Sequence, residues 1–247
     1  MEVHHHPDLH HKKKNFKEYF FEFLMMFLAV TLGFFAENIR EHLSDKQNEK
    51  DYIISLVNNL EDDTAHLKYT LGRASMQLSG IDTLVKITKS QFSKLPVQDS
   101  IFYYSIFYLN EETEFEQNDF TVVQLRNAGG YRLIKKDHVA DSIAAYESAN
   151  NDIKNQAKYY VDAFAKRYQD FIEIFDFKYG YQVFSNRQKI PTNLPVAVTT
   201  NKQKINSYYN QCYMISITLE GYRNMLNEHL NYLIRLINFL KTEYDLK

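Results

Sequence analysis

Residues 205–240 read INSYYNQCYMISITLEGYRNMLNEHLNYLIRLINFL, and this stretch decides the fold class. Its apolar residues recur at alternating spacings of three and four, so they lie along one face of a helix, which we call a seam. Ten of the eleven seam positions are apolar, and the spacing never slips. The seam comprises Ile205, Tyr208, Cys212, Ile215, Leu219, Tyr222, Leu226, His229, Leu233, Leu236 and Leu240. Such a face needs other helices to cover it, which predicts an all-α bundle.

Two further stretches carry the same spacing. The earlier seam runs from Ile53 to Val85, and nine of its ten positions are apolar. It comprises Ile53, Val57, Leu60, Thr64, Leu67, Leu71, Ala74, Leu78, Ile81 and Val85. The later seam comprises Val139, Ile143, Tyr146, Asn150, Ile153, Ala157, Tyr160 and Phe164, then Tyr168, Phe171 and Phe175 after a one-residue slip. Three long seams predict a long antiparallel helical bundle of three long helices plus two short ones.

The stretches between the seams predict where the chain reverses. The first long helix is expected to end near residue 92, the second to cover 137–177, and the third to begin near Thr200 or Asn201. The first connection is expected to contain a helix capped by Asp99 or Ser100 and ending at Leu109, then a loop or a helix end over 111–119. A helix over 120–128, ended by Gly129 and Gly130, follows. The second connection is expected to be a long loop over 178–200 with a small strand pair.

The composition supports an architecture with few turns. The 247 residues include only 7 Gly and 4 Pro, about 4.5% together, where average usage gives about 12%. This scarcity argues against a β-sandwich, a barrel and a Gly-rich nucleotide-binding fold. A net charge of −2 gives no basic field for nucleic acid, and one cysteine, Cys212, excludes an intrachain disulfide.

An apolar segment precedes the bundle. Residues 19–36 read YFFEFLMMFLAVTLGFFA, with Glu22 as the one charge, and 18 helical residues span about 27 Å. That length is just enough for a bilayer core, so 19–36 is expected to be an uncleaved transmembrane helix. A cleaved signal peptide is one alternative, but Phe34 and Phe35 stand where small residues are needed. A buried or interfacial helix is the other alternative.

Three residues of this segment are candidate functional positions. Ala29 and Gly33 form a small-xxx-small pair that permits close packing of a second helix. Glu22 is either an intramembrane carboxylate with a relay role or an interfacial residue that reaches the headgroups.

Charges near the two ends of the segment predict its orientation. The N-terminal side carries Lys12, Lys13, Lys14 and Lys17, and the other side carries Arg40, Lys46 and Lys50. The bias places the N-terminus in the cytoplasm. We therefore expect a disordered cytoplasmic tail over 1–18, the transmembrane helix over 19–36 and an extracytoplasmic bundle over 37–247. With the first helix rising from the membrane, helix lengths place the 129–130 turn at the far end of the bundle and the 178–200 loop back near the membrane surface.

A histidine tract lies in the N-terminal tail. His4, His5, His6, His10 and His11 are weak candidates for metal ligands, since imidazole clusters bind Zn, Cu or Ni. One alternative is a partial affinity tag, and the other is a partly cationic tail beside anionic lipid headgroups. No cofactor is expected.

Polar residues interrupt each seam once, at Thr64, Asn150 and His229. Buried polar residues of this kind usually fix helix register, and helix lengths place Asn150 and His229 in neighbouring layers. The nearest match to a di-iron Glu-x-x-His motif is Asp63 with His66, which occurs once, where such sites need two motifs. Sequences typical of a P-loop, a nucleophile elbow or a zinc protease are missing, so an enzyme is not expected.

Two segments resemble a known group of proteins. Residues 17–42, KEYFFEFLMMFLAVTLGFFAENIREH, and residues 125–147, LRNAGGYRLIKKDHVADSIAAYE, are similar to uncharacterised single-pass membrane proteins of Bacteroidetes. The resemblance implies an inner-membrane protein with a helical periplasmic part, and it brings no catalytic residue with it.

These observations predict a membrane-anchored interaction or scaffold protein. Its expected partners are the lipid bilayer and either a membrane protein or a second copy of the chain. The alternative is a sensor or accessory subunit that relays an extracytoplasmic signal through its one transmembrane helix, which would need a pocket between bundle helices.

Overall fold

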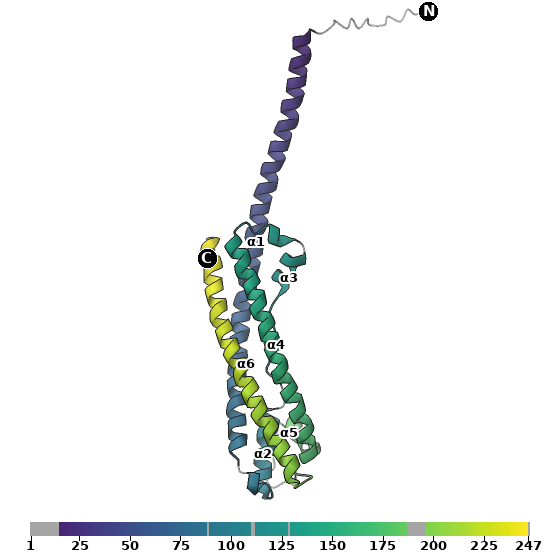
Figure 1. The fold of residues 1–247 in the computed structure, drawn as a ribbon, viewed down its shortest axis with the longest axis vertical. Helices are drawn as coiled ribbons and strands as arrows, with labels where there is room; N and C mark the ends of the chain where they lie inside the picture. Colours follow the sequence, from purple (N-terminus) through teal and green to yellow (C-terminus); the bar gives the residue numbers. More distant parts are fainter. Residues whose placement is uncertain (1–14, 88, 110–111, 128, 187–195, 247) are drawn as a thin grey trace, which may run out of the picture. The chain divides into compact units, whose positions relative to one another are not determined.

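A computed structural model describes residues 15–87, 89–109, 112–127, 129–186 and 196–246, with side chains omitted for 182–186. The chain forms two compact units, one up to Lys50 and one from Asp51 onward. The regular elements are α1 (Phe16–Lys86), η1 (Lys89–Gln91), α2 (Leu95–Tyr108), α3 (Phe120–Asn127), η2 (Gly130–Arg132), α4 (Asp137–Ile174), α5 (Phe177–Asn186) and α6 (Lys202–Glu243). The predicted all-α class is confirmed (Figure 1).

The first unit consists of the N-terminal part of α1. Its large apolar side chains are exposed, among them Phe23, Met26 and Phe34 at 63%, 67% and 72%. An 18-residue window of this helix has a mean hydropathy of 1.9, and none of that window is buried by the rest of the chain. The helix is therefore long and apolar enough to cross a membrane.

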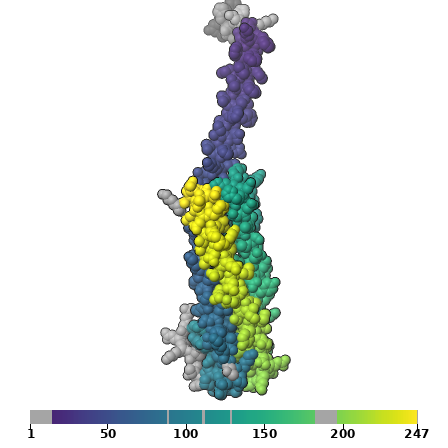
Figure 2. Space-filling view, turned by 60° about the vertical axis from the view of Figure 1, so that its left-hand side comes forward, coloured from purple at the N-terminus to yellow at the C-terminus, as the bar shows by residue number. Residues whose placement is uncertain are grey.

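The second unit contains three long helical stretches, formed by the later part of α1, by α4 and by α6. In Figures 1 and 2, α4 and α6 lie side by side along their lengths. Lys136, which precedes α4, forms an ion pair with Glu243 at the end of α6 (3.0 Å), and Phe171 near the end of α4 contacts Tyr208 near the start of α6 (ring centroids 6.2 Å). These two helices are therefore antiparallel, as predicted.

The direction of α1 differs from the prediction. The Tyr146 hydroxyl donates to the Asp63 carboxylate (2.9 Å) and the Tyr160 hydroxyl donates to Oε1 of Gln77 (3.2 Å), so 14 residues along α1 match 14 residues along α4 in the same direction. Lys241 of α6 pairs with Glu61 of α1 (2.8 Å). In the second unit, α1 thus runs parallel to α4 and antiparallel to α6, the reverse of the predicted arrangement.

The cause is the non-helical segment 112–119. Thr113 contacts Gln77 and Asn118 contacts Asp63, so five residues of this segment match 14 residues of α1, about 21 Å. An extended chain of five residues spans about 17 Å, whereas a helix of that length rises only about 7.5 Å. The segment therefore carries the chain back along the bundle before α3 begins. As a result, the 129–130 turn lies at the end of the second unit where residues 53–63 lie, and the bridge between Phe175 and Ala197 lies at the opposite end.

Several predicted boundaries also change. The first helix ends at Lys86 instead of residue 92, and α4 ends at Ile174 instead of 177. The cap of α2 is Lys94 instead of Asp99 or Ser100, because Pro96 sits in the first turn, where its missing N–H is tolerated. The region expected to be a loop after α4 contains α5, and an isolated antiparallel bridge joins Phe175 to Ala197.

Other boundaries are confirmed. The segment 112–119 is free of helix, and α3 ends at Asn127, just before the glycine pair. Gly129 has a φ of +67°, which is the left-handed conformation that favours glycine. The Asn201 side chain caps α6 by accepting from the backbone N–H groups of Gln203 (2.9 Å) and Lys204 (3.3 Å).

Candidate functional site

The buried face of α1 matches the predicted seam only in part. Ile53, Val57, Leu60, Leu67, Ala74 and Ile81 are buried as expected, but Leu71, Leu78 and Val85 are only partly buried. The buried face also includes five residues that each lie one position before a predicted seam residue: Leu56, Asp63, Thr70, Gln77 and Leu84. Three of these residues are polar, spaced seven apart, and each is 2% exposed. Buried polar groups on this scale need partners inside the bundle.

Segment 112–119 supplies partners for two residues of this polar stripe. The backbone N–H of Asn118 donates to Oδ1 of Asp63 (2.8 Å), and the Thr113 hydroxyl donates to Oε1 of Gln77 (2.6 Å). Thr70 instead donates to the His66 carbonyl of its own helix (2.9 Å). His66, one turn from Asp63, has its Nδ1 3.1 Å from the carbonyl oxygen of Glu116. The stripe therefore holds the segment at both of its ends.

Tyrosines of α4 and α6 complete the groove. The Tyr160 hydroxyl accepts from the backbone N–H of Thr113 (3.1 Å), and the Tyr222 hydroxyl accepts from that of Phe115 (2.8 Å). The rings of Tyr160 and Tyr222 stack with centroids 6.1 Å apart. Side chains thus take the place of the neighbouring strand that an extended backbone normally requires. We call the groove that α1, α4 and α6 form around residues 112–119 the segment groove.

Burial keeps the acids of the segment groove in their neutral forms to higher pH. Desolvation raises the pKa of Asp63, and the hydrogen bonds from Asn118 and Tyr146 offset only part of this effect. Desolvation also raises the pKa of Tyr160 and of Tyr222 to about 12. Both phenols therefore remain neutral near pH 7, able to donate and accept at once.

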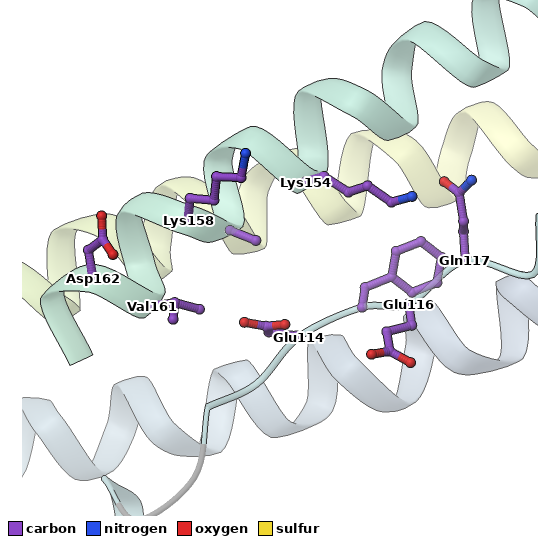
Figure 3. Close-up of a pocket in the computed structure, with 9 residues that line it drawn as sticks. Glu114, Glu116, Gln117, Lys154, Lys158, Val161 and Asp162 are labelled. Carbon is purple, nitrogen blue, oxygen red and sulfur yellow. The ribbon is translucent and has the colours of Figure 1, made fainter. Parts of the chain in front are cut away.

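A cleft lies between the segment and α4 (Figure 3). Its volume is about 570 Å³. One wall is formed by residues 114–117 of the segment and the other by α4 residues from Lys154 to Asp162. The lining residues are Glu114, Phe115, Glu116, Gln117, Lys154, Ala157, Lys158, Val161 and Asp162.

The walls of the cleft carry opposite charges over an apolar base. Glu114 and Glu116 are exposed, whereas Phe115 between them is 7% exposed, an alternation typical of an extended chain. Partial burial raises the pKa of Glu114, and repulsion from Glu112 and Glu116 adds to this. Lys154 and Lys158 lie on the α4 wall. This arrangement fits a ligand or peptide that carries both charges and an apolar body.

Two of the predicted polar seam residues lie deep in the bundle and close together. Asn150 is 2% exposed and His229 is 3% exposed. Tyr146, one turn before Asn150, stacks on the His229 ring with centroids 5.9 Å apart. Neither ring nitrogen of His229 has a hydrogen-bond partner among the described residues, and burial lowers the pKa of His229 to about 4. The third residue, Thr64, differs from the expectation because it is only partly buried and donates to the Glu61 carbonyl (2.7 Å).

The remaining candidates lie in the first unit or outside the described residues. Glu22, Ala29 and Gly33 lie in the N-terminal part of α1, and a Cβ built on Gly33 would meet nothing within 4 Å. His4, His5, His6, His10 and His11 lie outside the described residues. Among the residues that the structure describes, no three His, Cys, Asp or Glu side chains are placed to hold a metal ion.

Cys212 is fully buried on the α6 seam. Desolvation raises the pKa of its thiol to about 12, so it behaves as a small core residue and not as a nucleophile.

The segment groove was missed by the sequence reasoning, although its signal is present. Asp63, Thr70 and Gln77 share a spacing of seven, and Tyr146 and Tyr160 share a spacing of 14 on the facing seam. Comparisons with protein-family models, with curated proteins and with solved structures each found no match to this chain.

Proposed function

We propose that this protein is a membrane-anchored, non-enzymatic helical interaction or scaffold protein. The observation that carries the proposal is the fully exposed apolar part of α1, which is long enough to cross a bilayer, on the same chain as a well-packed helical bundle. Exposed apolar surface on this scale marks membrane or protein contact sites. The buried polar side chains of the segment groove bind the chain's own backbone, which supports a structural role for them.

We further propose the inner membrane of a Gram-negative cell as the location, with a cytoplasmic N-terminus and a periplasmic bundle. The lysine bias and the Bacteroidetes resemblance support this topology. The test uses single cysteines at two exposed residues, Asn15→Cys and Ser148→Cys, in a Cys212→Ala background. A membrane-impermeant maleimide should label residue 148 in spheroplasts, and residue 15 only after permeabilisation. Labelling of residue 15 alone in intact spheroplasts would reverse the proposed topology.

The proposed partner is a membrane protein or a second copy that packs on the Ala29 and Gly33 face. In situ crosslinking followed by mild-detergent purification and mass spectrometry tests this. Gly33→Leu should abolish the crosslinked species because it blocks close helix approach, while Phe35→Leu, on the opposite side of the helix, should leave it intact. Recovery of the unmodified chain alone argues against a stable partner.

The cleft favours a second candidate, a sensor or accessory subunit of a membrane complex. Its volume of about 570 Å³ and its opposite charges give the bundle a place to bind a signal molecule. In this role Glu22 would relay the signal in the membrane. A Glu22→Gln substitution that leaves partner function unchanged would remove the relay idea while leaving the scaffold role intact.

A further inference from the structure

Arg167 is a buried charge that has no carboxylate partner among the residues that the structure describes. It lies on α4 and is 2% exposed. Its Nη2 donates to the Leu109 carbonyl, and its Nε has no acceptor among the described residues. The rings of Phe164, Phe171 and Tyr168 lie 4.8, 5.8 and 5.8 Å from the guanidinium carbon. A guanidinium presents five donors and does not lose its charge, so one carbonyl and three rings leave it under-satisfied.

A small pocket adjoins this guanidinium. Its volume is about 140 Å³. The pocket is lined by Ser105, Ile106, Leu109, Arg167, Tyr168, Phe171 and Phe177. The Ser105 hydroxyl already bonds to the Ile101 carbonyl (2.5 Å) and the Tyr208 hydroxyl. Of the buried polar side chains in the lining, Arg167 is therefore the one with donors to spare, whereas Tyr168 is 44% exposed.

We propose that this pocket binds the carboxylate of a small apolar organic acid. Arg167 would hold the carboxylate by two parallel N–H···O bonds, the geometry for which a guanidinium is suited. An apolar cavity of about 150 Å³ is large enough for a benzene molecule, so this pocket suits an acid of about the size of benzoate. Inorganic phosphate fits less well, because the mostly apolar lining would strip its hydration without replacing it.

The pocket has an entrance of its own. Tyr168 and Phe177 are 44% and 39% exposed, and their rings meet edge to face at 6.1 Å. A rotation of these two side chains would admit a ligand without separating the helices. The site lies at the α2 and α5 end of the bundle, away from the cleft at 114–117. The proposal goes beyond the anchoring role above and does not depend on it.

Calorimetric titration of the full-length protein in nanodiscs tests the proposal, with empty nanodiscs as the blank. Benzoate should bind one equivalent per chain. Benzamide, its neutral isostere, should bind at least about tenfold weaker, because it lacks the charge that strengthens the bonds to Arg167. Equal binding of benzoate and benzamide, or no binding of benzoate by the native protein, would overturn the proposal.

Variants assign the binding to Arg167. Arg167→Met should lose benzoate binding by at least about tenfold and should match or exceed the native melting temperature, because it removes an unpaired buried charge. Arg235→Met, at an exposed site on α6, is the matched control and should bind benzoate normally. If the methionine variant does not fold, Arg167→Lys is the substitute. It keeps the charge but loses the planar guanidinium that forms two parallel hydrogen bonds, and it should bind benzoate more weakly than the native protein. Unchanged binding in a folded Arg167 variant would overturn the proposal.

Glu111 provides the last control. It follows Leu109 by two residues and lies outside the described residues. Glu111→Gln should bind benzoate as the native protein does. Binding that appears only in this variant would identify Glu111 as the counter-ion of Arg167 and overturn the proposal.

Discussion

The Tyr146 hydroxyl donates a hydrogen bond of 2.9 Å to the buried carboxylate of Asp63, across two helices that run in the same direction. The same separation of 83 residues recurs at Tyr160 and Gln77. These two pairs align α1 with α4 and form the two ends of the segment groove. Their geometry explains why the bundle keeps a polar stripe in its core.

Removing the Tyr146 hydroxyl should destabilise the bundle. Tyr146→Phe leaves Asp63 with one partner fewer in a desolvated site, which we expect to lower the free energy of unfolding by about 1–3 kcal/mol. Tyr159→Phe is the matched control, because Tyr159 is 66% exposed, and should change stability by less than about 0.5 kcal/mol. Urea unfolding followed by circular dichroism measures both variants. Equal stabilities would contradict the role assigned to the Asp63 contact.

The insertion of segment 112–119 should depend on one apolar side chain. Phe115→Ala should cost about 3 kcal/mol because it leaves a cavity between α1, α4 and α6. Glu114→Ala, at the exposed neighbouring position, should cost less than about 0.5 kcal/mol. Hydrogen exchange adds a second measurement, since the amides of Phe115 and Asn118 should be protected. Rapid exchange at both amides would show that the segment does not occupy the groove.

Buried His229 should make the protein sensitive to acid. Burial lowers its pKa from 6.5 to about 4, so its contribution to stability is present above pH 6.5 and is lost as the pH falls from 6.5 through 4. The full loss corresponds to about 3 kcal/mol. Asp63 acts in the opposite sense, because its raised pKa favours the folded state at low pH.

His229→Phe isolates the histidine contribution. Its ring is surrounded by Phe115, Tyr146 and Tyr232, so phenylalanine should fit without loss of stability at pH 7. Unfolding at pH 7 and pH 4.5 should show a smaller pH difference for the variant than for the native protein. The same acid sensitivity in both proteins would mean that another group causes it.

The apolar part of α1 should hold the protein in membranes. Phe27→Arg places a charge in the middle of the expected span, at a cost of about 2.5–3.5 kcal/mol for insertion. Leu43→Arg, beyond the span at an equally exposed apolar residue, is the control. After carbonate extraction the native protein and the control should remain with the membrane fraction, and the Phe27 variant should be partly released. Release of the native protein would contradict membrane insertion.

The three long helices could be predicted from their apolar seams, and α3 from the glycine pair that follows it, but the course of segment 112–119 could not. The seam and the Asn201 cap predicted α6 almost to the residue. The parallel direction of α1 and α4 was missed because it depends on segment 112–119, whose acidic residues suggested a loop or a helix end. Its alternation of buried Thr113 and Phe115 with exposed glutamates has the period of an extended chain, a signal too short to stand out.

The polar side of α1 was missed for a related reason. A search for apolar spacing selects Leu71 and Leu78 and passes over Asp63 and Gln77, although the two sets differ by a single residue in register. Hydrogen bonds from Asn118 and Tyr146 offset the cost of burying the Asp63 carboxylate, and both partners are distant from Asp63 in the sequence. Arg167 was passed over in the same way, because its surroundings come from α2, α4 and α5.

The parallel alignment of α1 and α4 is tested most directly by pulsed electron paramagnetic resonance on spin-labelled full-length protein, with Cys212 replaced by alanine. Labels at the exposed residues Asn58 and Asp141 should give a short distance, whereas labels at Asn58 and Glu173 should be separated by about 48 Å, the rise of 32 helical residues. The reverse pattern, with Asn58 close to Glu173 and far from Asp141, would contradict the parallel register and with it the segment groove.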